Sequence, residues 1–196
     1  EPSDNPQVKA LVGTAAQTLI DLENRLNALD AKVGDGDTGS TFAEGAREIK
    51  RLLEQNALPL NNTAQLLQLT GERLATVMGG SSGVLMSIFF TAAGQAVHNA
   101  TPLPDALLLG LKQMKHYGGA DLGDRTLIDA LQPALEALRD RGLAAAIDAA
   151  QKGAESTATM QKAGAGRSSY VNSENLEGVT DPGAVAIAEV FAAIGK

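Results

Sequence analysis

The stretch VKALVGTAAQTLIDLENRLNAL, residues 8–29, carries apolar side chains at the three- and four-residue spacing of one helix face. The positions concerned are Val8, Leu11, Val12, Ala15, Leu19, Leu22, Leu26 and Leu29. The same spacing recurs to the end of the chain, whereas the alternation typical of strands does not. The pattern predicts one long helix here and an all-α fold.

Seven further helical segments follow, separated by short connections. Their apolar faces cover residues 42–53, 67–77, 84–97, 104–114, 127–138, 143–157 and 184–194. Residues 84–97 are apolar nearly all round, which predicts a central helix covered on all sides. Asp124 is expected to cap the sixth helix, with Pro133 kinking it or delaying its start, and Asp181-Pro182 should open the eighth. Eight helices with short connections predict an all-α bundle or barrel in one domain, residues 1–196.

Composition limits the class of protein. At 196 residues the chain is long enough to bury a sizeable core, and because only 3% of it is aromatic, Ala and Leu must build that core. The absence of cysteine excludes disulfides and thiolate metal ligands, and it is typical of the reducing cytoplasm. A net charge of -7 argues against a nucleic-acid surface. No signal peptide is visible, and no apolar run approaches the ~20 residues of a membrane span, so we expect a soluble cytoplasmic protein.

An acidic loop, DAKVGDGDTGS at residues 30–40, follows the first predicted helix. If Asp30, Asp35 and Asp37 converge, each carboxylate raises the pKa of the others unless a cation lies between them. Oxygen-only ligands favour Mg²⁺ or Ca²⁺. The spacing does not match an EF-hand, since the sixth and twelfth positions are Ser40 and Ala46. Taken alone, the loop is explained as well by a plain Gly/Asp turn as by a Mg²⁺ site.

Three glycine-rich junctions lead into helices: residues 39–41, 79–83 and 118–126. Each offers backbone N–H groups and the positive end of a helix dipole, which together suit a phosphate group. The third is not a P-loop, because Asp124 stands where that motif requires lysine. Each junction is also explained by ordinary helix capping. The aperiodic connection 163–183, which contains Arg167 and Tyr170, is predicted to be a lid.

Five ordered motifs, GDGDTGS, GGSSGVL, GDRTLIDAL, GAGRSSY and DPGA, resemble the nucleotide-binding L domain or subunit of dihydroxyacetone kinases. The resemblance spans essentially the whole chain and implies a barrel of eight antiparallel helices with ADP or ATP bound at one rim. It implies that Asp30, Asp35 and Asp37 ligate Mg²⁺. The implied nucleotide contacts are Thr38, Gly39, Ser40, Thr41, Ser81, Ser82, Gly118, Leu127, Arg167, Asp181, Pro182 and Gly183.

The resemblance also implies a kinase component that is incomplete without a K domain or subunit, which holds dihydroxyacetone through a histidine. Two forms remain open: an ATP-dependent form fused to K, and a phosphotransferase-system form that keeps ADP bound and is rephosphorylated by a phosphohistidine protein. MGGSSGVLMSIFFTAAG, and Thr38 in place of a frequent histidine, look more like the ATP-dependent form. A non-catalytic Mg-ADP-binding regulatory module would share the same site. No residue is assigned a catalytic role, and His98 and His116 are taken as helix-terminal histidines.

Overall fold

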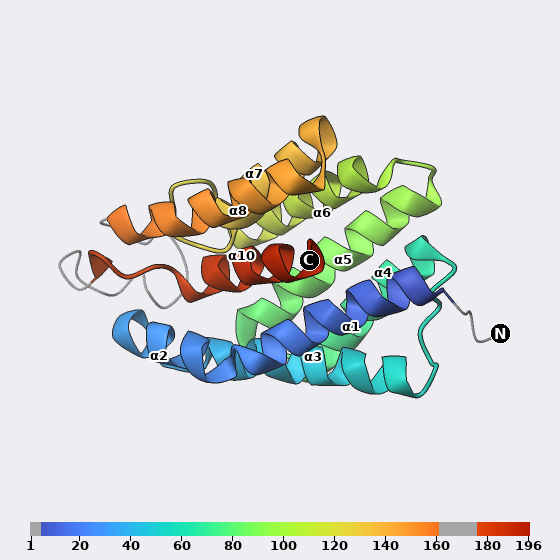
Figure 1. Cartoon of the computed structure of the whole chain (residues 1–196), viewed down its shortest axis with the longest axis horizontal. Helices are drawn as coiled ribbons and strands as arrows, with labels where there is room; N and C mark the ends of the chain where they lie inside the picture. Colours follow the sequence, from blue (N-terminus) through green and yellow to red (C-terminus); the bar gives the residue numbers. More distant parts are fainter. Residues whose placement is uncertain (1–4, 161–175) are drawn as a thin grey trace. The chain divides into compact units, whose positions relative to one another are not determined.

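The computed structural model describes residues 5–160 and 176–196, and every regular element in these ranges is a helix (Figure 1). The elements are α1 (Pro6–Asp21), α2 (Glu23–Val33), α3 (Thr38–Glu54), α4 (Thr63–Val77), α5 (Gly80–His98), α6 (Leu103–Gly118), α7 (Ile128–Arg141), α8 (Leu143–Ser156), η1 (Thr157–Thr159) and α10 (Pro182–Ile194). Each predicted helix is present, the first of them as two helices, so the all-α prediction is confirmed. Most of the predicted lid, including Arg167 and Tyr170, lies outside the described residues.

The chain divides into two compact units. The first consists of Glu1–Ile20 and Thr41–Gly118, and the second of Asp21–Ser40 and Gly119–Lys196. In the first unit α5 packs against α4 and α6, and in the second α7 packs against α8 while α10 contacts α8, α7 and α2. The assignment of the whole chain to one domain stays a prediction.

Glycine and alanine let the helices of the first unit approach closely. A Cβ at Gly94 of α5 would lie 2.7 Å from Gln68 Cγ of α4, and one at Gly110 of α6 would lie 2.4 Å from the carbonyl oxygen of Phe89. Both distances are shorter than an ordinary van der Waals contact, so a larger residue at either position would force the helices apart. The small residues therefore supply the close packing that a chain poor in aromatic side chains needs.

Helix α5 differs from its prediction in two ways. Its buried residues are Gly83, Phe89, Ala93, Gly94 and Ala96, whereas Val84 is 59% exposed, so the helix is covered on part of its surface and not on all sides. Its 19 residues are also long and apolar enough to cross a membrane by length and composition alone, and 28% of the apolar window is buried. Core helices of soluble proteins have the same length and composition, so this helix alone is weak evidence for a membrane span.

The first predicted helix is interrupted at Leu22, between α1 and α2. Leu22 keeps near-helical backbone angles (φ -84°, ψ -5°), and its carbonyl oxygen still accepts the N–H of Leu26 at 2.9 Å. The apolar spacing continues across this one-residue break, which is why periodicity predicts a single helix. Leu22 is the second residue of the second unit, whose first segment begins at Asp21.

The start of α7 also departs from prediction. Asp124 does not cap it; its carboxylate accepts the N–H of Asp121 at 2.8 Å, and the helix begins at Ile128. Pro133 lies inside α7 and has no N–H to donate to the carbonyl of Asp129, four residues earlier. Gly153 of α8 packs there, since a Cβ at this position would lie 2.1 Å from that carbonyl oxygen. The Asp129 carbonyl, which Pro133 leaves without its helical donor, therefore lies against Gly153 of α8.

Candidate metal and phosphate site

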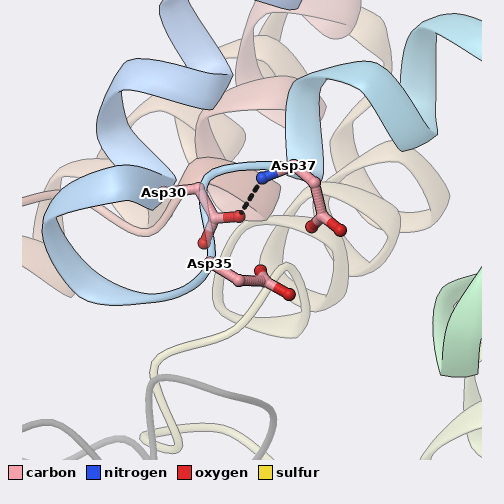
Figure 2. Close-up of side chains that lie close together, drawn as sticks. All are labelled: Asp30, Asp35 and Asp37. Carbon is pink, nitrogen blue, oxygen red and sulfur yellow. Dashed lines mark hydrogen bonds between the residues drawn. The ribbon is translucent and has the colours of Figure 1, made fainter.

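Of the acidic loop, residues 30–40, only residues 34–37 lie outside the helices; they join α2, which ends at Val33, to α3, which begins at Thr38. Gly36 adopts φ +81°, a left-handed conformation that glycine accepts without strain, and this turns the chain back on itself. Asp30 comes from the last turn of α2 and is buried, while Asp35 and Asp37 are exposed. One carboxylate oxygen of each lies within 4.8 Å of the others, and Figure 2 shows the three side chains gathered around the loop.

Asp30 organises this loop. Its Oδ2 accepts three hydrogen bonds: from the N–H of Asp37 at 2.9 Å, the N–H of Thr38 at 3.0 Å and the hydroxyl of Thr38 at 2.9 Å. Asp30 therefore caps the N-terminus of α3 from the preceding helix, satisfying donors that have no partner within α3. Gly34 fits beside it, because a Cβ there would lie 2.4 Å from Asp30 Oδ1. The loop conformation is built around this buried carboxylate.

The donor set fits a hard divalent cation. All three groups are carboxylates, and Mg²⁺ takes oxygen ligands at about 2.1 Å, so two oxygens on opposite sides of one ion are about 4.2 Å apart. Closing from 4.8 Å to that separation requires only small side-chain adjustments. Among the described residues, the hydrogen bonds that the Asp30 carboxylate accepts all fall on Oδ2, so Oδ1 remains for coordination. The three predicted ligands are brought together, and their role as ligands stays a prediction.

The first turn of α3 is held by α2. The N–H of Ser40 donates to Asn27 Oδ1 at 2.9 Å, and its hydroxyl contacts Asn27 Nδ2 at 3.0 Å and Glu23 Oε1 at 3.2 Å. Gly39 allows this contact, since a Cβ there would lie 2.0 Å from the Glu23 carbonyl oxygen. A phosphate that contacted the N–H groups of Thr38 and Ser40 would therefore have to replace existing partners. The predicted phosphate contacts of Thr38, Gly39, Ser40 and Thr41 stay predictions.

Leu127 and the Asp181-Pro182-Gly183 corner form a second group of predicted residues. Asp181 caps α10, as expected: its Oδ2 accepts the N–H of Ala184 at 2.9 Å, and Pro182 is the first helical residue. A Cβ at Gly183 would lie 3.1 Å from Asp181 Oδ2 and 3.2 Å from Leu127 Cβ, so the sequence-distant Leu127 adjoins this corner. The Asp181 N–H in turn donates to Thr157 Oγ1 at 2.8 Å.

The second unit also buries two charged residues, Arg125 and Asp129, to which the sequence assigned no role. Arg125 is 1% exposed and Asp129 is 4% exposed. Asp129 accepts the N–H groups of Gly123 at 2.7 Å and Thr126 at 2.9 Å, which fixes the chain on both sides of Arg125. Both residues belong to the motif GDRTLIDAL, which was the only sequence signal for them.

These buried charges perturb each other. The pKa of Asp181 is raised to about 6, chiefly by burial and also by the charges of Asp129 and Asp30, while the Ala184 N–H and the charge of Arg125 lower it. Burial likewise lowers the pKa of Arg125, against the attraction of Asp181. A buried carboxyl with a raised pKa, attracted by a buried guanidinium, is a combination that occurs preferentially at functional sites.

The remaining predicted residues lie in the first unit or outside the described residues. Ser81 and Ser82 are in the first turn of α5, and Gly118 is the last residue of α6. A Cβ at Gly118 would lie 3.1 Å from Leu85 Cδ2. Arg167 lies outside the part of the chain that the structure describes. The nucleotide contacts of these four residues stay predictions.

The sequence and the structure match known proteins. The curated dihydroxyacetone kinase of Citrobacter freundii is 61% identical over all of this chain, which spans 36% of that protein. The triokinases/FMN cyclases of Rattus norvegicus and Homo sapiens are 42% and 41% identical over 99% of the chain, which spans 37% of each. The chain thus spans about a third of the length of these relatives.

Two crystal structures of the C. freundii dihydroxyacetone kinase superpose on 98% of the chain and 34% of their own length. The native form gives a TM-score of 0.89 at 59% identity, and the complex with AMP-PNP and Mg²⁺ gives 0.87 at 57% identity. Residues 32–196 match the DAK2 domain. The resemblance to the L domain of dihydroxyacetone kinases is confirmed, and the chain belongs to the DAK2 domain family.

Proposed function

We propose that this chain is the nucleotide-binding, phosphoryl-donor part of a dihydroxyacetone kinase and binds Mg-ATP or Mg-ADP. The observation that carries the proposal is the convergence of Asp30, Asp35 and Asp37 within 4.8 Å, in a chain 57% identical to a kinase crystallised with AMP-PNP and Mg²⁺. Carboxylates that hold Mg²⁺ while substrate phosphates complete its coordination are the usual arrangement in phosphoryl transfer.

The three aspartates would have different roles in metal binding. Asp35 and Asp37 are exposed and would reach the metal directly, while Asp30 holds the loop folded with one oxygen and offers the other as a ligand. Bound Mg²⁺ would supply the positive charge that a nucleotide's phosphates require in an acidic protein. Phosphoryl transfer depends chiefly on positioning and charge neutralisation, so no general base from this chain is needed.

The phosphoryl acceptor would be dihydroxyacetone bound to a separate K domain or subunit. Two facts support this. The C. freundii relative is named a dihydroxyacetone kinase, and this chain spans only 36% of its length, which leaves room for a second domain. A phosphotransferase-type subunit that retains ADP, or a regulatory module that binds Mg-ADP without transferring phosphate, would use the same site. These alternatives differ in what happens after binding, and the second experiment below separates them.

The first experiment is thermal unfolding with and without Mg-ADP and with EDTA. At a ligand concentration of 100 times Kd, binding should stabilise the folded chain by about 2.7 kcal/mol. Asp35→Asn and Asp37→Asn should lose this increment and keep the apo stability, because both side chains are exposed. Asp148→Asn is the matched control, since Asp148 is an exposed aspartate of α8 paired with Lys152. Retention of the full nucleotide effect in both site variants would refute the assignment.

The second experiment measures phosphoryl transfer. The chain is mixed with a K protein, dihydroxyacetone and Mg-ATP, and the phosphorylated ketose is quantified. The ATP-dependent form predicts multiple turnovers with free ATP, whereas the phosphotransferase form predicts turnover only with a phosphohistidine donor. Tight Mg-ADP binding without transfer under either condition would leave the regulatory module as the function.

A further inference from the structure

The burial and the backbone conformation of Arg125 are both energetically unfavourable. Its side chain is 1% exposed, and its backbone is left-handed with φ +60°, which non-glycine residues seldom adopt. Its Nε and Nη1 atoms have no hydrogen-bond partner among the described residues. Buried donors without partners and a buried charge both oppose folding, so this arginine contributes little to stability compared with an apolar residue of the same size.

Among the described residues, the Arg125 side chain makes one hydrogen bond, and it reaches a distant segment. Nη2 of Arg125 donates to the carbonyl oxygen of Val179, 54 residues later. That segment is also held by the N–H of Gly178, which donates to the Ala158 carbonyl at 2.8 Å. Leu176 is fully buried against Val33, the last residue of α2, and Val179 packs on the same cluster. Arg125 therefore joins the loop before α7 to a segment packed on the helix that ends at the acidic loop.

The segment leads directly into the Asp181-Pro182-Gly183 corner. Val179 precedes Asp181 by two residues, and the buried Asp181 carboxylate attracts the guanidinium. Leu127, which adjoins Gly183, lies two residues after Arg125 in the sequence. The guanidinium thus acts between the two chain segments that carry the predicted nucleotide contacts of this unit. Because Asp129 pins Gly123 and Thr126, the loop has little freedom to present Arg125 in any other way.

From these contacts we infer that Arg125 is a positioning residue for the nucleotide: it fixes the corner 181–183 against Leu127 and sets nucleotide affinity without touching the metal loop. This inference rests on the proposed function. It predicts a separation of effects: nucleotide affinity should fall while the chain still folds, because Asp181, which loses a charge that lowers its pKa, can bind a proton in the variant. A purely structural arginine would show the reverse, with lost stability and unchanged nucleotide affinity.

The test compares Arg125→Met, Arg125→Lys and a control, Arg25→Met, in the full chain. Arg25 of α2 also bonds to α10, through Glu189 at 3.1 Å, but both side chains are exposed. Three quantities are measured: Kd for Mg-ADP by calorimetry, Kd for Mn²⁺ alone by electron paramagnetic resonance, and apo unfolding by urea.

For Arg125→Met we expect the Kd for Mg-ADP to rise roughly tenfold, as for a residue that acts through its neighbours. Its Kd for Mn²⁺ should equal that of the wild type, and the urea midpoint of its apo form should not fall below that of the wild type. Arg125→Lys, which keeps the charge but lacks the planar fork, should fall between wild type and Arg125→Met. The control should match wild type in all three measurements.

The results distinguish the two proposals. A wild-type chain that binds no Mg-ADP refutes the proposed function. If the wild-type and Arg125→Met chains bind Mg-ADP equally well, only the positioning role is refuted. If Arg125→Met weakens the binding of Mn²⁺ alone as much as the binding of Mg-ADP, the positioning role is also refuted, because the effect would then extend beyond residues 181–183. If Arg125→Met does not fold, Arg125→Lys decides: weaker Mg-ADP binding supports the role, and wild-type binding overturns it.

Discussion

Replacing Asp181 by Asn should make the apo protein more stable at neutral pH, although it removes a helix-capping carboxylate. Asp181 is buried, and burial raises the pKa of its carboxyl to about 6. The groups that face it are Arg125, whose charge lowers the pKa, and Asp129 and Asp30, whose charges raise it. Asparagine keeps an oxygen that can accept the Ala184 N–H, so the cap survives while the buried charge is removed.

The sign follows from proton binding. Because the folded-state pKa is above the ordinary value of 3.8, the folded chain binds this proton more tightly than the unfolded chain does. The free energy of unfolding of the wild type therefore falls as pH rises from about 4 to about 6, and then levels off. The difference between about 6 and 3.8, at 1.36 kcal/mol per pKa unit, corresponds to about 3 kcal/mol.

The assay is urea unfolding of wild type and Asp181→Asn in EDTA, between about pH 4 and about pH 8. At each pH we take the difference between the two free energies of unfolding, and we compare this difference across the pH range. Effects of the substitution that do not depend on pH are the same at every pH, so they do not contribute to the change. The variant should gain up to about 3 kcal/mol relative to wild type across this range, with most of the gain below about pH 6.5.

Asp140→Asn is the control with the opposite sign. Asp140 is exposed, and the hydrogen bond from Arg139 is the main cause that lowers its pKa, so that its contribution is present at neutral pH and lost as pH falls. The relative stability of this variant should decline slightly as pH rises. A stability difference for Asp181→Asn that is flat across the range, or that declines like the control, would show that the buried carboxyl does not have a raised pKa.

Three further substitutions test the local geometry. Gly39→Ala should destabilise the chain by about 1–3 kcal/mol in urea unfolding, since its Cβ would lie 2.0 Å from a carbonyl oxygen of α2, whereas Gly79→Ala, with nothing within 4 Å, should stay within about 0.5 kcal/mol of wild type. Gly153→Ala should lower the melting temperature despite the higher helix propensity of alanine, because its Cβ would lie 2.1 Å from a carbonyl oxygen of α7; an unchanged melting temperature would contradict this close contact. Asp30→Ala should cost about 1–3 kcal/mol of apo stability through three lost hydrogen bonds, and Asp35→Ala should cost less; equal losses would mean that Asp30 does not organise the loop.

The sequence by itself determined the helical class, the start of α10 and the acidic cluster. Helices form through contacts three and four residues apart, and caps such as Asp181-Pro182 act within one turn, so both are visible locally. Asp30, Asp35 and Asp37 lie within eight residues of one another, so a single tight turn could bring them together. The order of five short motifs was enough to indicate the family.

Tertiary structure decided what depends on residues distant in sequence. The break at Leu22 leaves the apolar spacing intact, so the spacing alone does not reveal it. The partial cover of α5 depends on which helices pack beside it, and an apolar composition cannot show that. The burial of Arg125 depends on a carbonyl 54 residues away, because a charged side chain is stable inside a protein only where distant segments supply its partners.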